Sequence, residues 1–218
     1  MPKAMNVTLL CSDRRHPVMP HLRAWAKLNG KALNVSLVDD IHDVVGGEIL
    51  FLISCSQKIE KADRDKFKKV LVIHASDLPT GRGWSPHVWS IVGGADHLVV
   101  TLLEAEDTID SGDIWHKLTI DIPSHFLSDE INEALFSAEI ELIDFAVANF
   151  ETIRPEAQDS TQKVTYHRKR TPDDSEISID MPLGEQFDLI RVCDPERFPA
   201  HFRFRGHTYK ITLEKLYE

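Results

Sequence analysis

The chain lacks the features that mark several large classes of protein. Its 218 residues include three cysteines, Cys11, Cys55 and Cys193, which lie far apart and form no C-x-x-C pair, so neither a disulfide framework nor a zinc site is expected. No apolar run approaches the ~20 residues that a membrane span needs. The start also lacks the long apolar region and small-residue cleavage site of a signal peptide. These absences predict a soluble, cytoplasmic protein without a metal.

An excess of positive charge is also absent. The chain has 25 Lys and Arg against 35 Asp and Glu, a net charge of −10. Residues 163–218 carry 10 of each, so the whole acidic excess lies in residues 1–162. Nucleic-acid binding is not expected, because phosphate contacts need a basic surface. With 42% hydrophobic residues the chain can bury a core, which excludes a disordered protein.

Short β-rich runs alternate with helix-like segments through the first 150 residues. This alternation predicts an α/β protein with a mostly parallel sheet and crossover helices. The expected strands are 6–12, 32–38, 48–54, 70–74, 98–103 and 115–122, and the expected helices are 19–28, 59–69, 85–92 and 128–150. Gly30 is expected to end the first helix and Ser128 to be the N-cap of the last one.

Polar residues from Arg154 to Lys163 indicate a linker. The chain is therefore divided into a main α/β domain, 1–153, and a smaller extension, 154–218. The extension is expected to hold a strand at 165–168, a helix at 185–192 and a hairpin formed by 201–205 and 208–213 with its turn at Gly206. Alternation places Phe202 and Phe204 on one face of the hairpin, either as a dimer patch or packed on their own domain.

Two strand ends carry groups capable of chemistry. The apolar strand 70–74 ends at His74 and enters a Pro- and Gly-rich loop, and open α/β sheets bind ligands at such strand ends. A histidine exchanges protons near neutral pH, although it can also simply hydrogen-bond a turn. The strand 98–103 enters a loop rich in carboxylates, where Asp110 follows His74 by 36 residues. The two strand ends can be neighbours and form a His–Asp pair; alternatively, the loop is a solvated acidic loop or a cation site.

The two segments together carry a motif. It comprises His74-Ala-Ser76-Asp-Leu78-Pro79, Arg82-Gly83, Pro86, Trp89, Thr101 and Asp110-Ser-Gly112-Asp113-Ile114. The motif resembles the folate-dependent formyltransferase family, which includes methionyl-tRNA formyltransferases, and within it most of all the nucleotide-sugar N-formyltransferases. Similar segments at 168–177 and 191–200 extend the resemblance over residues 48–213. The resemblance implies a Rossmann-like, mostly parallel sheet flanked by helices, with a small C-terminal β-hairpin.

The resemblance implies a catalytic pair of His74 and Asp110, and Ser76 is added to this catalytic group as a candidate oxyanion donor. In the family, an acceptor amine attacks the formyl carbon of N10-formyltetrahydrofolate. The histidine and an asparagine stabilise the oxyanion, and the aspartate orients the histidine and helps to remove the amine proton. The asparagine position is Val72 here, and losing an oxyanion donor can cost about 2.7–4 kcal/mol. A protonated His74, the hydroxyl of Ser76, Ser54 or Ser56, or a backbone N–H of residues 81–83 can replace it.

Binding residues are assigned on the same basis. The pterin of the folate cosubstrate is expected against the backbone of the loop 104–110, without a metal. The implied folate contacts are Ser54, Cys55, Leu103, Glu104, Ala105 and Asp107.

The loop after the first strand is the expected site of the acceptor, because two adjacent arginines and a histidine can grip a diphosphate or carboxylate. The expected contacts are Ser12, Arg14, Arg15, His16, Arg82 and Trp84. An ordinary charged turn is the alternative for this loop, and Trp84 can stack on a base or sugar.

The leading hypothesis is an N-formyltransferase acting on a nucleotide-linked amino sugar, as in surface-polysaccharide synthesis. The neutral extension disfavours tRNA as the acceptor. An amino acid or a carrier-bound aminoacyl group is the alternative acceptor, and a non-catalytic folate or sugar-nucleotide binder is the alternative class because of Val72. A serine hydrolase built on Ser76 is disfavoured, since no G-x-S-x-G turn exists. By resemblance, a homodimer through the C-terminal hairpin is expected.

Overall fold

A six-stranded sheet forms the centre of the protein in the computed structural model, which describes residues 4–216. Its order is β2-β1-β3-β4-β6-β7. The first four are parallel: β1 (Asn6–Leu10), β2 (Asn34–Val38), β3 (Gly47–Leu52) and β4 (Phe67–His74). Strand β6 (His97–Glu104) lies antiparallel to both β4 and β7 (Ile114–Asp121). The predicted α/β fold with a mostly parallel sheet is confirmed.

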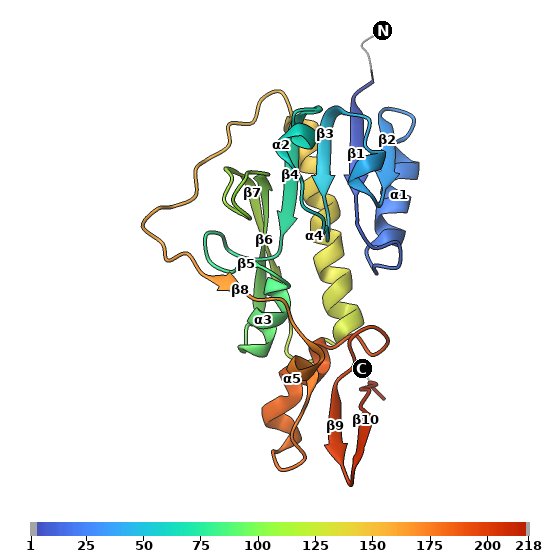
Figure 1. The fold of residues 1–218 in the computed structure, drawn as a ribbon, viewed down its shortest axis with the longest axis vertical. Helices are drawn as coiled ribbons and strands as arrows, with labels where there is room; N and C mark the ends of the chain where they lie inside the picture. The colour runs from blue at the N-terminus through green and yellow to red at the C-terminus, as the bar shows by residue number, and fades with distance from the viewer. Residues whose placement is uncertain (1–3, 217–218) are drawn as a thin grey trace.

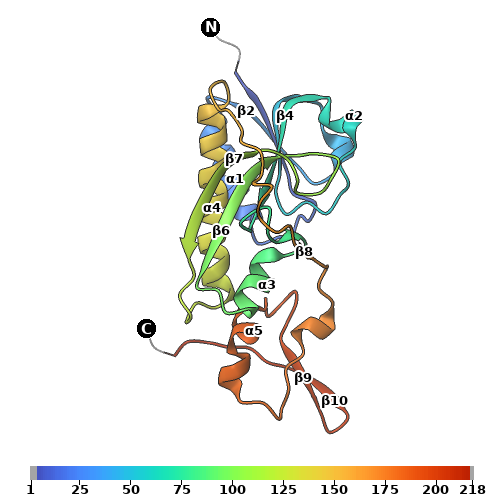
Figure 2. The same ribbon diagram turned by 90° about the vertical axis from the view of Figure 1, so that its left-hand side faces the viewer.

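The two faces of the sheet have different covers (Figures 1 and 2). Helices α1 (Met19–Asn29) and α4 (Ser128–Asn149) pack on the face that carries Leu9, Phe51 and Leu71, all fully buried. The other face has a smaller apolar cluster around Leu50 and Val70. It is covered by loops, by the short helix η1 (Ile41–Asp43) and, near the sheet edge, by α2 (Lys61–Arg64). Side chains on this second face are therefore less covered by helices than side chains on the first face.

Two local predictions are wrong. The predicted helix 59–69 is a single turn, α2, because Phe67 begins β4 and the following residues pair with β3 from Gly47 onward. Pairing within the sheet thus overrides the helical charge pattern. The N-cap of α4 is Leu127, not Ser128, and the Glu130 carboxylate accepts the Leu127 N–H at 2.8 Å.

The chain after α4 crosses the molecule before it forms the extension (Figure 1). A long loop leads to β8 (Tyr166–His167), which pairs in parallel with β5 (Arg82–Gly83) beside α3 (Pro86–Val92). The extension then continues through η2 (Pro172–Ser175), η3 (Leu183–Gln186), α5 (Phe187–Val192), β9 (His201–Phe204) and β10 (His207–Lys210). It has its own small apolar cluster, centred on Ile177 and Ile190. The hairpin sends Phe202 toward this cluster, whereas Phe204 is 42% exposed.

No helix within residues 4–216 is long and apolar enough to cross a membrane.

Candidate active site

His74 ends β4 on the more open face of the sheet. Its side chain is buried, and Nε2 lies 2.9 Å from the carbonyl oxygen of Gly81. Because a carbonyl oxygen can only accept, Nε2 must carry a proton in this contact. The other ring nitrogen, Nδ1, faces Asp110.

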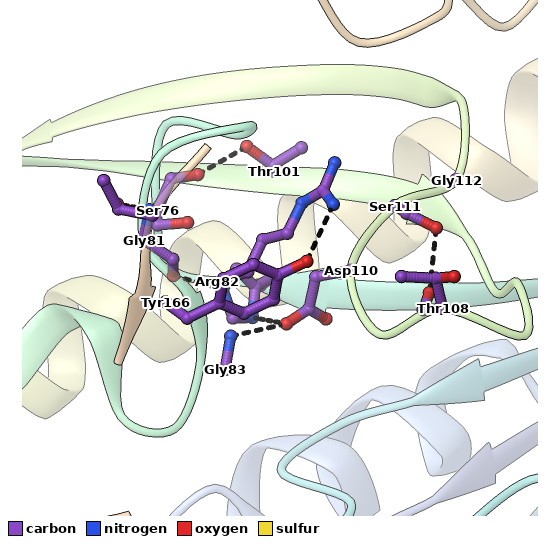
Figure 3. Close-up of polar contacts among 12 residues, drawn as sticks. Ser76, Gly81, Arg82, Gly83, Thr101, Thr108, Asp110, Ser111, Gly112 and Tyr166 are labelled. Atoms are coloured by element: carbon purple, nitrogen blue, oxygen red, sulfur yellow. Dashed lines mark hydrogen bonds and ion pairs between the residues drawn. The ribbon is translucent and has the colours of Figure 1, made fainter. Parts of the chain in front are cut away.

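Asp110 completes the predicted pair. Its Oδ2 lies 3.6 Å from Nδ1 of His74, and each side chain is 8% exposed. The same oxygen accepts the Gly83 N–H at 2.8 Å (Figure 3). Asp110 has a φ of 54°, in the left-handed region that few residues other than glycine adopt. Such strain persists where surrounding contacts hold the residue in place.

His74 and Asp110 come together, but not because the ends of their strands are neighbours, as the sequence suggested. Since β6 runs antiparallel to β4, His74 pairs with Thr101, and Glu104, the last residue of β6, lies opposite Leu71. The strand ends are thus not neighbours, and the loop after β6 must fold back to reach His74. Gly112 permits this return, because a Cβ there would lie 2.0 Å from the Glu104 carbonyl oxygen.

Gln158, from the segment predicted to be a linker, anchors the folded-back loop. Its Nε2 donates to the carbonyl oxygens of Asp110 at 2.8 Å and Gly112 at 3.0 Å. Its Oε1 accepts from Nη2 of Arg82 at 2.7 Å. Nothing in the local sequence marks Gln158, because its partners are 46 to 76 residues away.

Arg82 is used inside the protein rather than left free for an acceptor. Besides the bond to Gln158, its Nη1 donates to the Tyr166 hydroxyl at 3.2 Å (Figure 3). The residue is 9% exposed. This geometry does not support the predicted contact between Arg82 and the acceptor. The Arg82 side chain instead links the β5 loop to the Asp110 loop through Gln158.

Ser76 presents a buried hydroxyl with no hydrogen-bond partner among residues 4–216. Its carbonyl accepts the Thr101 hydroxyl at 2.7 Å, which fixes the backbone. The side chain lies beside Gly81, since a Cβ on Gly81 would be 3.0 Å from Cβ of Ser76. An unpaired buried hydroxyl thus lies next to the contact between His74 and Gly81.

The backbone N–H groups proposed as oxyanion donors are already engaged. Gly81 N–H donates to the Thr165 hydroxyl at 2.8 Å, and Arg82 N–H to the Thr165 carbonyl at 2.9 Å. Gly83 N–H donates to Asp110, as described above. That alternative for replacing the family asparagine is therefore wrong in this conformation, whereas the Ser76 hydroxyl remains free.

The expected folate residues divide into two groups. Cys55 and Ala105 are half-buried at the edge of the apolar cluster on the open face, together with Val72. This edge can accept the flat face of a pterin. Leu103 is fully buried, so its side chain cannot reach a ligand on the surface.

The remaining expected folate side chains are turned elsewhere. Oε1 of Glu104 accepts from Lys69 at 2.6 Å and from the Trp115 indole at 3.0 Å. Asp107 is mostly exposed and paired with Arg64. Ser54 is exposed. Any contact of these residues with folate would have to use their backbone.

The two adjacent arginines of the first loop diverge. Nε of Arg14 contacts Asp39 at 2.5 Å, on the loop after β2, so Arg14 and Arg15 do not form the predicted paired grip. Arg15 is exposed, and its side chain has no hydrogen bond or ion pair within residues 4–216.

The other expected acceptor residues are placed as follows. The Ser12 hydroxyl accepts the Ser56 N–H at 2.8 Å, which joins the loops after β1 and β3. His16 is half-buried, and burial together with the nearby Arg197 lowers its pKa to about 4. Trp84 is 40% exposed, with the Lys169 ammonium 4.8 Å from its ring centre.

Comparison with known proteins identifies formyltransferases as relatives of the chain. No protein-family model matches the chain. A stretch of 142 residues, 65% of the chain, is 32% identical to the methionyl-tRNA formyltransferase of Rickettsia bellii and covers 46% of that protein. The chain spans about half the length of the curated relatives it matches.

Solved structures share the fold. A methionyl-tRNA formyltransferase from Clostridium thermocellum matches with a TM-score of 0.84 and 22% identity, over 98% of this chain and 94% of that one. A sugar N-formyltransferase from Shewanella sp. matches with a TM-score of 0.71 and 20% identity, over 98% and 99%. HypX from Aquifex aeolicus in complex with tetrahydrofolic acid matches with a TM-score of 0.79 and 19% identity, over 94% and 37%. The resemblance of the chain to the formyltransferase family is therefore confirmed.

Proposed function

We propose that the protein transfers a formyl group from N10-formyltetrahydrofolate to the primary amine of a nucleotide-linked amino sugar. The observation that carries this proposal is the buried pair of His74 and Asp110, 3.6 Å apart, in a chain related to formyltransferases. A structural neighbour that binds tetrahydrofolic acid supports folate as the donor.

The pair suits the proton transfers of this reaction. The neutral amine attacks the formyl carbon, a new C–N bond forms, the bond from carbon to N10 breaks, and tetrahydrofolate leaves. The amine loses one proton and N10 gains one. Nδ1 of His74 faces the Asp110 carboxylate at 3.6 Å, and we propose that the pair receives the first proton and supplies the second.

The oxyanion needs a donor in place of the family asparagine. Val72 lies two residues before His74 on the same strand and packs in the apolar cluster, so it offers no hydrogen bond. The Ser76 hydroxyl is buried and has no hydrogen-bond partner in the part of the chain that the structure describes. A preorganised donor of this kind stabilises developing negative charge more strongly than water does, because it needs no reorientation during the reaction.

The folate would lie along the edge formed by Cys55, Val72 and Ala105. These half-buried side chains provide an apolar wall on the same sheet face as His74. The loop that follows Ala105 leads directly to Asp110. A pterin on this wall would bring the formyl group toward the His74–Asp110 pair.

The choice of a sugar acceptor rests on the negative charge of the protein and on the small number of free cations that a small acceptor needs. The chain has a net charge of −10, and many of its cations are in ion pairs, including Arg14, Arg64 and Arg197. A tRNA acceptor relies on a broad unpaired basic surface for affinity. A small phosphorylated acceptor needs one or two free cations, such as Arg15.

Mass spectrometry tests the proposal. The protein is incubated with N10-formyltetrahydrofolate and a panel of nucleotide-linked 3-amino and 4-amino sugars, with His74→Ala as the control. A product heavier by one formyl group, absent with the control, is the expected result. Folate binding by calorimetry without any product would favour the second candidate, a non-catalytic binder, for which Val72 is the supporting observation.

A further inference from the structure

A cleft lies between the loop after β1 and the segment before β9. It has a volume of about 440 Å³ and is lined by Asp13, Arg15, Glu196, Arg197 and Phe198. This volume is within the range of small-molecule sites, ~300–1,000 Å³. The two sides of the cleft are joined by the ion pair of Arg197 with Asp13, at 2.7 Å, between residues that are 184 positions apart in sequence.

The cleft contains one arginine side chain, that of Arg15, for which no ion pair is found within residues 4–216. Asp13 is paired with Arg197, and contacts from the Arg15 N–H and Arg197 lower its pKa. Glu196 is paired with Lys210 at 3.0 Å. The Arg15 guanidinium has no hydrogen bond or ion pair within residues 4–216, and its charge acts on the nearby Asp13 only at longer range. Its backbone is fixed by the bond from its N–H to Asp13 Oδ1 at 2.9 Å. A free guanidinium on a fixed backbone is suited to bind phosphate oxygens.

An aromatic face stands next to this charge. Phe198 is 64% exposed, and the Arg197 guanidinium lies 5.3 Å from its ring centre. An exposed aromatic ring beside an anion site offers a surface on which a nucleobase can stack.

The cleft is also connected to the catalytic pair. His16, directly after Arg15, accepts the Val18 N–H on Nδ1, so in its neutral form Nε2–H is free to donate. Burial lowers the pKa of His87 to about 4, and His87 is also close enough to His16 and His74 for their charges to contribute to the same shift. Strands β1 and β4 are separated by β3 alone, so their carboxyl ends are about 10 Å apart. A sugar attached to a phosphate can bridge this interval.

We infer that this cleft binds the nucleoside diphosphate part of the acceptor, with Arg15 on the phosphates and Phe198 against the base, so that the C-terminal extension helps to select the substrate. The inference rests on the proposed function for the identity of the acceptor. Its contacts, however, can be measured without any turnover.

Binding measurements on the full chain test the cleft. Calorimetry is carried out with inorganic pyrophosphate and with UDP, dTDP and GDP. Arg15→Gln is expected to raise Kd for pyrophosphate and for the best nucleotide by about 10- to 100-fold. Phe198→Ala is expected to raise Kd for the nucleotide about 10-fold while leaving pyrophosphate unchanged. Both side chains are exposed, so neither variant should impair folding.

Arg23→Gln is the matched control, because Arg23 is an exposed arginine on α1 outside the cleft. Equal weakening by Arg15→Gln and Arg23→Gln would overturn the inference, as would the absence of pyrophosphate and nucleotide binding to the unmodified protein. Binding of AMP without binding of any diphosphate would also overturn it.

A formylation assay distinguishes failure of this inference from failure of the proposed function. A formylated nucleotide sugar whose KM is unchanged in Arg15→Gln would reject the cleft and keep the function. Diphosphate binding that responds to the variants as expected, with no formylated product, would keep the cleft and reject the function.

Discussion

Asp110 and Glu139 are two buried carboxyl groups with opposite surroundings. The Asp110 carboxylate accepts the Gly83 N–H and faces His74, while Gln158 holds its backbone. Glu139, in the middle of α4, is 5% exposed, and its Oε2 has no hydrogen-bond partner within residues 4–216. Burial raises the pKa of Glu139 to about 8. A buried carboxyl can serve chemistry where donors surround it, whereas without donors it costs stability.

Removal of either member of the catalytic pair should have the largest effect. Asp110→Asn keeps an oxygen that can accept the Gly83 N–H, but it removes the charge that faces His74. We expect Asp110→Asn and His74→Ala each to lower kcat by about 10²- to 10⁴-fold with little change in Tm. Steady-state kinetics and thermal unfolding measure both, and near-normal rates in the two variants would refute the assignment.

Glu139→Gln should change stability rather than rate. In the unfolded chain Glu139 ionises near pH 4.5, but in the folded protein it keeps its proton to about pH 8. Unfolding therefore releases a proton between these values, so its contribution to stability falls as pH rises from 4.5 to 8 and is constant above that. The total change across this interval is about 5 kcal/mol, at about 1.4 kcal/mol for each pKa unit.

Denaturant unfolding between pH 4.5 and 9 measures this effect. The difference in unfolding free energy between Glu139→Gln and the unmodified protein should grow in favour of the variant across that interval. Parallel curves for the two proteins would show that Glu139 finds a partner in solution.

Ser76→Ala should change the rate and leave stability unchanged, whereas Glu139→Gln should change stability and leave the rate unchanged. The hydroxyl has no partner to lose, so Tm should stay the same or rise slightly, whereas kcat should fall about 10²-fold if the hydroxyl stabilises the oxyanion. Thr101→Val is the matched comparison, because it removes the hydroxyl bonded to the Ser76 carbonyl and should lower Tm. An unchanged kcat in Ser76→Ala would assign the oxyanion contact to another donor.

Gln158→Ala should have the smallest effect, a loss of about 10-fold in kcat, because Asp110 keeps its contact with Gly83 but loses its backbone anchor. The pH profile of kcat should also shift, since the carboxylate is freer to move away from His74. Gln162→Ala, an exposed glutamine of the same loop, is the control. If Gln158→Ala lowers Tm without moving the pH profile, the role of Gln158 is structural alone.

Much of the fold could be predicted because its signals are local. The alternation of apolar strands and the periodicity of residues 128–150 predict the main elements within a few residues. Residues 59–69 are the exception and show the limit of prediction from local signals. The charged sequence resembles a surface helix, but Phe67 and Val70 gain more by joining the sheet next to β3.

The candidate site could be predicted in its residues but not in its geometry. The family motif singles out His74, Asp110 and Ser76, whereas the spacing argument for their contact assumed strand ends that are neighbours. The antiparallel β6 separates those ends, and the return of the loop depends on Gly112 and Gln158.

The sequence by itself determined the strand that ends at His74, the acidic loop that contains Asp110 and the exposed charge of Arg15. The tertiary structure alone decided which of these groups meet. Gln158 reaches Asp110 across 48 residues, and Arg197 reaches Asp13 across 184. Contacts of this length leave no periodic or compositional signal in the chain, because they depend on how separate elements pack.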